Sequence, residues 1–161
     1  METDVQKVWD YVTSRFQGHW SSLHGPTHWR RVERNAVLLA SRTSANVTVV
    51  RLFAIFHDSA RVHDGWDDGH GARGAEYARE LRGVVYDLND EEFDLLHYAC
   101  VWHTNGMVHE NSTIATCWDA DRLDLGRCGI MPDPKRMCTE FGRAIARMGS
   151  VEQFLEKESE P

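Results

Sequence analysis

Apolar residues recur at intervals of three and four along most of the chain, which is the spacing of one face of an α-helix. The first such segment begins at Val5, and Gly18 follows its last apolar residue. Pro26 then suits the first turn of a second helix, whose inner face extends to Ala40. The same spacing predicts five further helices, over residues 47–60, 70–83, 90–103, 112–126 and 134–148.

The segment at 47–60, VTVVRLFAIFHDSA, is apolar nearly all round. Its β-branched residues at 47–50 permit a strand, but its length and its second half favour a buried central helix. A polar, glycine-bearing loop follows at 60–71, and the acidic tail at 151–161 is expected to be frayed at its EKESEP end. We find no repeat, low-complexity tract or linker, and we therefore predict one all-α domain over residues 1–161, a bundle of six or seven helices.

Composition excludes several classes of protein. Among the 161 residues, 42% are apolar and 27% charged, which is an ordinary globular mixture. The net charge of −7 has the wrong sign for a nucleic-acid coat, and no apolar run is long enough to span a membrane. The four cysteines form no CxxC pair, and the N-terminus has no secretory pattern, so we expect a cytoplasmic protein. Exposed aromatic residues permit a homodimer.

Histidines and aspartates gather where helices are expected. His57 and Asp58 close the most hydrophobic segment, where an unpaired carboxylate would be costly to bury, although a plain helix terminus could explain this pair alone. His28 lies at the start of the preceding helix, and Asp119 and Asp121 lie in CWDADRLDLGR. Only one of these last two can face inward, because residues two apart on a helix point about 200° apart. Ligands from three helices suit a metal site in a bundle core, and a mixed histidine and carboxylate set suits Mn, Fe, Co, Ni or Zn, with Mg also possible.

The stretches HWRRVERNA, LFAIFHDSARVHD and WDADRLDLG carry these residues in the order H…HD…D. This order resembles the HD-domain superfamily of metal-dependent phosphohydrolases, over a motif-bearing core of about residues 24–130. The resemblance implies His28, His57, Asp58 and Asp121 as metal ligands, since only Asp121 has the A-D-x-L context. Asp119 would then orient a histidine or a water molecule.

The resemblance also extends to further histidines. Some branches of the superfamily use additional histidines to hold a second metal or the scissile phosphate, and His70 and His103 fall where those occur. His97 is either a neighbour that supports the ligands or a half-buried helix histidine. His24, close in sequence to His28, could close over the site.

Two arginines are candidates for contact with phosphate. Arg61 lies one helical turn beyond His57, where other members place a basic residue that contacts phosphate, and Arg73 follows His70 by three positions and could face the same cleft. For each arginine the alternative is a solvated or salt-bridged surface residue. We assign catalysis to Asp58, which would hold the metal and steer its water, and to Arg61.

The resemblance implies hydrolysis of a phosphoester or pyrophosphate bond in a nucleotide or related small phosphorylated metabolite. The stretch HTNGMVHEN lacks the HHExxDGxGYP motif of the branch that cleaves cyclic dinucleotides, which argues against that activity. Two alternatives stay open: a diiron oxygenase-type enzyme, which the additional histidines permit, and a sensor that binds metal or nucleotide without turnover. A plain structural domain would leave the ordered H…HD…D set unexplained.

Overall fold

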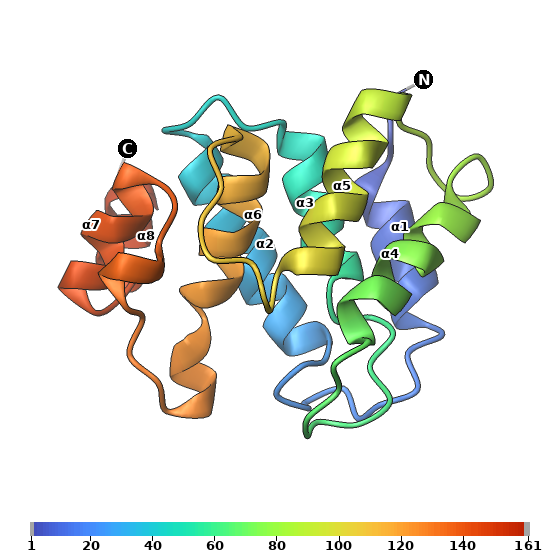
Figure 1. Ribbon diagram of the computed structural model, residues 1–161, viewed down its shortest axis with the longest axis horizontal. Coiled ribbons are helices and arrows are strands. Elements are labelled where there is room, and N and C mark those ends of the chain that lie inside the picture. Colours follow the sequence, from blue (N-terminus) through green and yellow to red (C-terminus); the bar gives the residue numbers. More distant parts are fainter. Residues whose placement is uncertain (1, 160–161) are drawn as a thin grey trace.

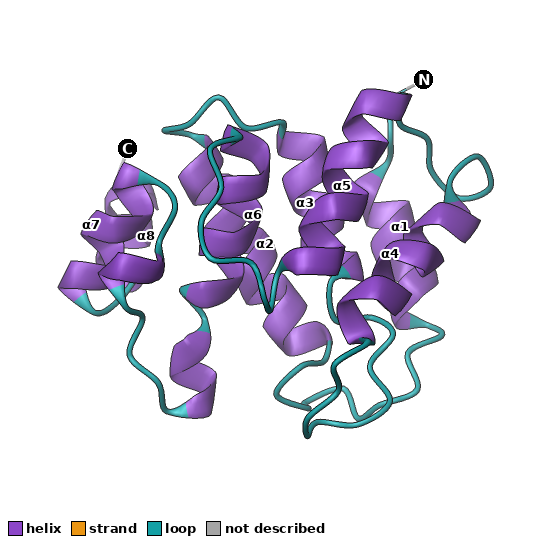
Figure 2. Ribbon diagram, viewed as in Figure 1, coloured by secondary structure: helices purple, strands orange, loops and turns teal. Residues whose placement is uncertain are grey.

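The computed structural model describes residues 2–159, with side chains as far as residue 155. Its helices are connected by loops and turns, so the all-α prediction is confirmed (Figures 1 and 2). None of the helices in this part of the chain is both long and apolar enough to cross a membrane. The helices are α1 (Val5–Thr13), α2 (Pro26–Ala40), α3 (Val47–Phe56), α4 (His70–Leu81), α5 (Asp90–Trp102), α6 (Ser112–Arg122), α7 (Glu140–Met148) and α8 (Glu152–Ser159), with short 3₁₀ helices η1 (Leu125–Cys128) and η2 (Pro134–Arg136).

Polar side chains fix where most of these helices begin. Each accepts a hydrogen bond from a backbone N–H in the first turn, which would otherwise lack a partner. In α5 the cap is reciprocal, because Glu92 also accepts a bond from the backbone N–H of Asn89. The capping residues are Asp4 for α1, Asn46 for α3, Asn89 for α5, Asn111 for α6 and Thr139 for α7.

Helix α3 lies at the centre of the molecule. It packs against α1, α2, α4, α5 and α6, and its side chains from Val49 to Phe56 are buried except that of Arg51. Burial on all sides explains why this segment is apolar nearly all round, and the strand that its β-branched residues permitted does not form. Because α3 ends inside the bundle, the two residues that follow it, His57 and Asp58, lie in the core.

Two glycines let α4 approach its neighbours. A Cβ at Gly74 would lie 2.3 Å from the carbonyl oxygen of Phe56, and a Cβ at Gly71 would lie 2.5 Å from that of Cys100. A side chain at either position would therefore push α4 away from the end of α3 or from α5. This contact places the first residue of α4, His70, beside His103, which follows α5.

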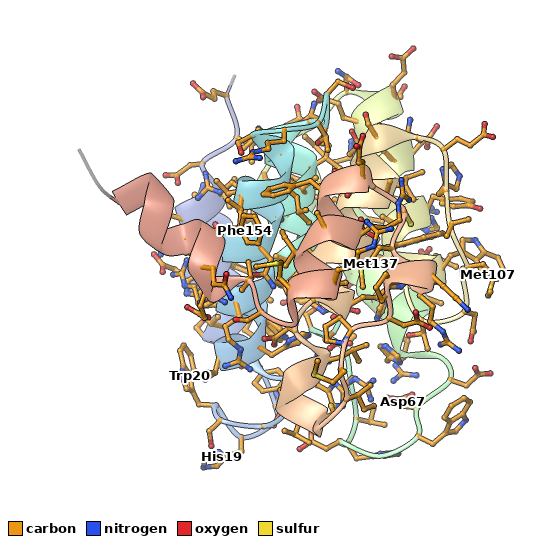
Figure 3. The ribbon with its side chains drawn as sticks, turned by 90° about the vertical axis from the view of Figure 1, so that its left-hand side faces the viewer. His19, Trp20, Asp67, Met107, Met137 and Phe154 are labelled. Atoms are coloured by element: carbon orange, nitrogen blue, oxygen red, sulfur yellow. The ribbon has the colours of Figure 1, made fainter. Side chains whose placement is uncertain are left out.

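The C-terminal third differs from the prediction. The helix expected over 112–126 ends at Arg122 and is followed by η1, and the helix expected over 134–148 is divided into η2 and α7. The EKESEP end of the tail, residues 156–161, is predicted to be frayed, but the chain is helical from 152 to 159, so the described part contains eight α-helices instead of six or seven. Val151 is buried, and Phe154, which is labelled in Figure 3, packs edge-on against Phe141. The ring centroids of these two phenylalanines lie 5.2 Å apart. Residues 160–161 lie outside the described residues.

Candidate metal centre

The structure brings together the four residues that the resemblance implied as ligands. His28 comes from α2, His57 and Asp58 follow α3, and Asp121 comes from α6. The Nε2 atoms of His28 and His57 lie 3.0 Å apart, and Asp58 Oδ2 lies 3.4 Å from each of them. Asp121 Oδ1 lies 3.1 Å from His28 Nε2 and 3.4 Å from His57 Nε2. These four residues are called the first group below.

A second group shares Asp58 with the first. His70 and His103 face the other carboxylate oxygen, with Asp58 Oδ1 at 3.2 Å from His70 Nε2 and 3.5 Å from His103 Nε2. The two Nε2 atoms lie 3.0 Å apart. Asp58, His70 and His103 are buried and form the second group. The carboxylate of Asp58 therefore lies between the two groups, with one oxygen toward each.

All four histidines turn the same ring nitrogen toward the metal centre. In each ring Nδ1 faces an oxygen acceptor and must carry the proton, which leaves a bare lone pair on Nε2 in the neutral ring. The acceptors are the carbonyls of Phe53 (3.1 Å) and Ala54 (3.0 Å) for His57, the carbonyl of Cys100 (2.7 Å) for His103, the carbonyl of Asp67 for His70, and the carboxylate of Asp124 (2.7 Å) for His28.

This arrangement fits a divalent cation. Four lone pairs and two carboxylates converge, and groups that only accept hydrogen bonds repel one another unless a proton or a cation lies between them. Neighbouring ligands of one ion with bonds of about 2.1 Å lie about 3.0 Å apart in octahedral and about 3.4 Å apart in tetrahedral geometry. The separations within the first group, 3.0 to 3.4 Å, match that range. In addition, Asp121 Oδ1 is buried without a hydrogen-bond partner among the described residues.

Protons compensate the charges of the first group when no ion is bound. Burial by itself lowers the pKa of His57, but the carboxylates of Asp58 and Asp121 outweigh burial and raise that pKa to about 10. Burial favours the neutral form of both carboxyls, yet the neighbouring histidines hold the pKa of Asp58 and of Asp121 well below the usual value. A proton on His57 thus supplies part of the positive charge that an ion would bring.

We expect metal binding to release protons and to tighten as pH rises. Because the pKa of His57 is raised to about 10, the ring is protonated at neutral pH, and an incoming ion must displace that proton. The affinity should therefore fall about tenfold per pH unit for each displaced proton between about pH 8 and about pH 6. Calorimetric titration in buffers of different ionisation enthalpy measures both quantities. An affinity that does not change with pH would show that no proton is displaced.

Two further side chains contact Asp58. Arg61 Nε donates a hydrogen bond to Asp58 Oδ1 at 3.2 Å, and its Nη1 donates to the carbonyl of Gly65 at 3.1 Å. His24 Nδ1 is buried 3.3 Å from Asp58 Oδ2 and makes no hydrogen bond to any residue that the structure describes. Arg61 thus lies beside the carboxylate that both groups share, and its contact with phosphate stays a prediction. His24 lies over the same carboxylate, in the wall of the cavity described next.

A cavity of about 520 Å³ opens beside the two groups. Asp58, Asp121 and His103 form part of its wall, together with His24 and Arg61. Residues between 122 and 137 form much of the remaining wall. The candidate metal centre is therefore accessible to a ligand of moderate size from one side, while its histidines stay buried.

Asp119 does not support the ligands as expected. Its carboxylate accepts hydrogen bonds from the backbone N–H groups of Cys138 (2.7 Å) and Thr139 (2.8 Å) and from the hydroxyl of Thr139 (2.7 Å). A Cβ at Gly142 would lie 2.3 Å from Asp119 Oδ2, so α7 approaches this carboxylate closely. Asp119 faces α7 and fixes its start, which corrects the expectation that it orients a histidine or a water molecule.

His97 and Arg73 also lie away from the two groups. His97 is partly exposed on α5, and its Nε2 lies 2.9 Å from a carboxylate oxygen of Glu76 on α4. Arg73 forms an ion pair with Asp67 and donates to the carbonyl of Ala60 at 3.1 Å, and it is not part of the cavity wall. Both predictions are therefore corrected. His97 contacts none of the candidate metal ligands, and Arg73 forms a salt bridge that fixes the loop before α4, which was the alternative to contact with phosphate.

Sequence reasoning missed Asp124. Its Oδ2 accepts the Nδ1 proton of His28 at 2.7 Å, and its Oδ1 accepts a hydrogen bond from Arg31 Nε at 2.8 Å. Asp124 therefore has the role that had been expected of Asp119. The signal was present, because Asp124 follows Asp121 by three residues, the spacing at which side chains share one face of a helix.

Comparison with known proteins gives matches among solved structures. The crystal structure of a predicted HD superfamily hydrolase from an uncultured Thermotogales bacterium is 25% identical, with a TM-score of 0.73 over 95% of this chain and 90% of that one. The structure of an HD-superfamily hydrolase from Bacillus thuringiensis is 18% identical and shares the fold, with a TM-score of 0.59 over 96% of both chains. No family model and no curated protein matches the sequence.

Proposed function

This chain is an HD-domain protein, and we propose that it is a metal-dependent phosphohydrolase. Its substrate would be a nucleotide or a related small phosphorylated metabolite, cleaved at a phosphoester or pyrophosphate bond. The observation that supports this proposal is the convergence of four histidine lone pairs and two carboxylates beside a cavity, whose wall contains both carboxylates, His103 and arginines.

The chemistry that a divalent ion supplies in such a site is a coordinated water whose pKa is lowered from about 15.7 toward about 7. The first group would hold this ion, and the second group offers a position for another that shares Asp58. Arg61 places a guanidinium beside Asp58, where it would stabilise the negative charge that develops on the phosphoryl oxygens. His24 covers the same carboxylate and limits the access of solvent to it.

The size and chemistry of the cavity support a small organic phosphate. Its volume of about 520 Å³ lies within the range of small-molecule sites. Guanidinium groups suit phosphate oxygens, and the apolar side chains of the same wall suit an uncharged organic group.

The test is release of phosphate or pyrophosphate by protein stripped with chelator and reloaded separately with Mn, Co, Ni, Zn or Mg. The substrates are nucleoside mono-, di- and triphosphates, sugar phosphates and an aryl phosphodiester, whose cleavage is followed by release of its phenol. We expect hydrolysis of at least one substrate that depends on the added metal. Absence of hydrolysis across the whole panel, with metal bound to the protein, would contradict the proposal.

The second group favours one alternative enough to test it. Two ions that share a carboxylate are also the arrangement of diiron enzymes, and the sequence left an oxygenase-type activity open. Iron-loaded protein exposed to oxygen would then show the optical absorption of an oxidised diiron centre, whereas a hydrolase needs none. A sensor would bind metal and nucleotide without turnover in either assay.

A further inference from the structure

The chain between α6 and α7 forms much of the cavity wall. It contains η1 and η2, and it passes from Asp121 in the first group to Met137, which is labelled in Figure 3. Five residues of this segment line the cavity and have side chains suited to contact a ligand: Leu125, Arg127, Ile130, Met131 and Met137. They are called the η1–η2 wall.

Arg127 is a buried arginine with an unused donor. Its side chain is only 8% exposed, although it lines the cavity. Its Nε donates to the carbonyl of Leu23 at 2.7 Å, and its Nη1 donates to the carbonyl of Asp124 at 2.9 Å. The third nitrogen, Nη2, lies 3.9 Å from Asp121 Oδ1 and makes no hydrogen bond to the described residues. The guanidinium is therefore held in place by two backbone carbonyls while one N–H₂ group faces the metal centre.

Two neighbouring arginines of the cavity, Arg61 and Arg122, have partners for their side chains, and a fourth, Arg136, is exposed. Each nitrogen of the Arg61 guanidinium has a partner, namely Asp58, the carbonyl of Gly65, and His70. Arg122 donates to three backbone carbonyls in the 106–107 and 136 segments and fixes those segments. Arg127 is thus the one of these three whose Nη2 group makes no hydrogen bond to the described residues while its other two nitrogens are held by backbone carbonyls.

The other four residues of the η1–η2 wall are apolar, although Asp133 and Arg136 of the same segment also line the cavity. Met137 is buried, and Leu125 is partly buried. Ile130 is 52% exposed and Met131 is 70% exposed, at the edge of the same cavity. Two large apolar side chains left in water beside an arginine-bearing cavity are what an uncharged organic group would cover.

We propose that Arg127 Nη2 binds a phosphoryl oxygen of the substrate while Ile130 and Met131 cover a nucleoside-sized organic group. This proposal rests on the proposed function, and it narrows the substrate class. A phosphate monoester with an apolar planar body, such as a nucleoside monophosphate, should be preferred over a polyol phosphate such as glycerol phosphate. Arg127 would contribute to substrate binding without being a ligand of the metal.

Arg127→Met tests the phosphoryl contact. Inorganic phosphate is titrated calorimetrically into manganese-loaded wild type and variants, so that binding is read without turnover. We expect the affinity for phosphate to fall about tenfold, the usual cost of a lost charge-assisted hydrogen bond, with manganese binding retained. Arg127→Lys should recover part of the loss because it restores the charge. Arg147→Met makes the same change on the exposed end of α7, outside the cavity wall, and should bind phosphate like wild type.

The outcomes distinguish failure of the Arg127 assignment from failure of the phosphohydrolase proposal on which it rests. If wild type binds phosphate and Arg127→Met binds it equally well, the role of Arg127 is wrong and the phosphohydrolase proposal stands. If wild type neither binds phosphate nor hydrolyses any phosphate compound, both are wrong. Thermal melting of Arg127→Met shows whether loss of its carbonyl bonds has unfolded the wall; if it has, the Arg127→Lys variant decides.

Met131→Ser tests the apolar wall. The side chain is exposed, so its removal should leave the fold intact. We expect kcat/KM for nucleoside monophosphates to fall roughly threefold or more, through loss of apolar contact, with kcat/KM for glycerol phosphate unchanged. An equal effect on both substrates, or none on either, would overturn the assignment of this wall.

Discussion

Replacing Asp58 with asparagine is expected to abolish metal binding and all metal-dependent hydrolysis. Asp58 Oδ2 faces His28 and His57, and Oδ1 faces His70 and His103. One substitution therefore removes the only carboxylate of the second group and one of the two carboxylates of the first, which leaves Asp121. Asparagine keeps the shape of the side chain but adds an N–H₂ group among lone pairs. An activating ion contributes several kcal/mol to such a reaction, so hydrolysis should fall at least about 1,000-fold.

The effect of Asp58→Asn is measured as metal content after dialysis and as the rate on the best substrate. Circular dichroism should show an unchanged helix content, because the Asp58 carboxylate contacts the histidines of the two groups and is not part of the apolar packing of the core. Asp68→Asn removes an exposed carboxylate from the neighbouring loop and should behave like wild type. Retention of full activity by Asp58→Asn would show that the chemistry occurs elsewhere.

The fold was predictable to the extent that it depends on local patterns. Apolar residues at helical spacing and polar caps such as Asn89 lie in the sequence itself, and they located most of the helices. Helix ends that depend on distant contacts were missed. The interruption before α7 depends on Asp119, which accepts hydrogen bonds from backbone some twenty residues further along the chain.

The acidic tail shows the same limit. Its charge suggested a frayed end, but Val151, Phe154 and Leu155 lie at helical spacing and pack against the core. Three apolar residues in a short acidic stretch are a weak signal, because an isolated helix of this length is unstable in water. Phe141, which meets Phe154 edge-on, supplies the packing that makes the helix form.

The ligands of the candidate site could be predicted from the sequence, but the groups that hold those ligands in position could not. Histidine and aspartate at helix ends carry a chemical signal, and the order of the H…HD…D set carries more. The partner of each Nδ1 atom, by contrast, depends on tertiary structure. By residue type alone, His97 and Arg73 could not be told apart from the residues of the site. The packing of α4 against α5 places His97 beside Glu76, and the loop before α4 places Arg73 beside Asp67.

Replacing Asp124 with alanine is expected to weaken metal binding about 10- to 100-fold, the usual effect of removing the carboxylate behind a ligating histidine. Asp124 is buried, and its Oδ2 lies 2.7 Å from His28 Nδ1. The other three histidines donate to backbone carbonyls, which no side-chain substitution removes. His28 therefore depends on Asp124 alone for its ring orientation and for keeping the proton on Nδ1 and the lone pair on Nε2.

The comparison with Asp124→Asn separates positioning from packing. Asparagine keeps an acceptor for the Nδ1 proton but not the charge, so its metal affinity should fall between those of wild type and Asp124→Ala. Nitrogen-15 NMR of His28 should show the proton on Nδ1 in wild type and a mixture of tautomers in the alanine variant. Arg31→Gln removes the other partner of Asp124 and leaves the contact with His28 in place, so it should change the metal affinity little. If Arg31→Gln were as damaging as Asp124→Ala, the ion pair with Arg31 would be what supports the site, and the tautomer of His28 would be secondary.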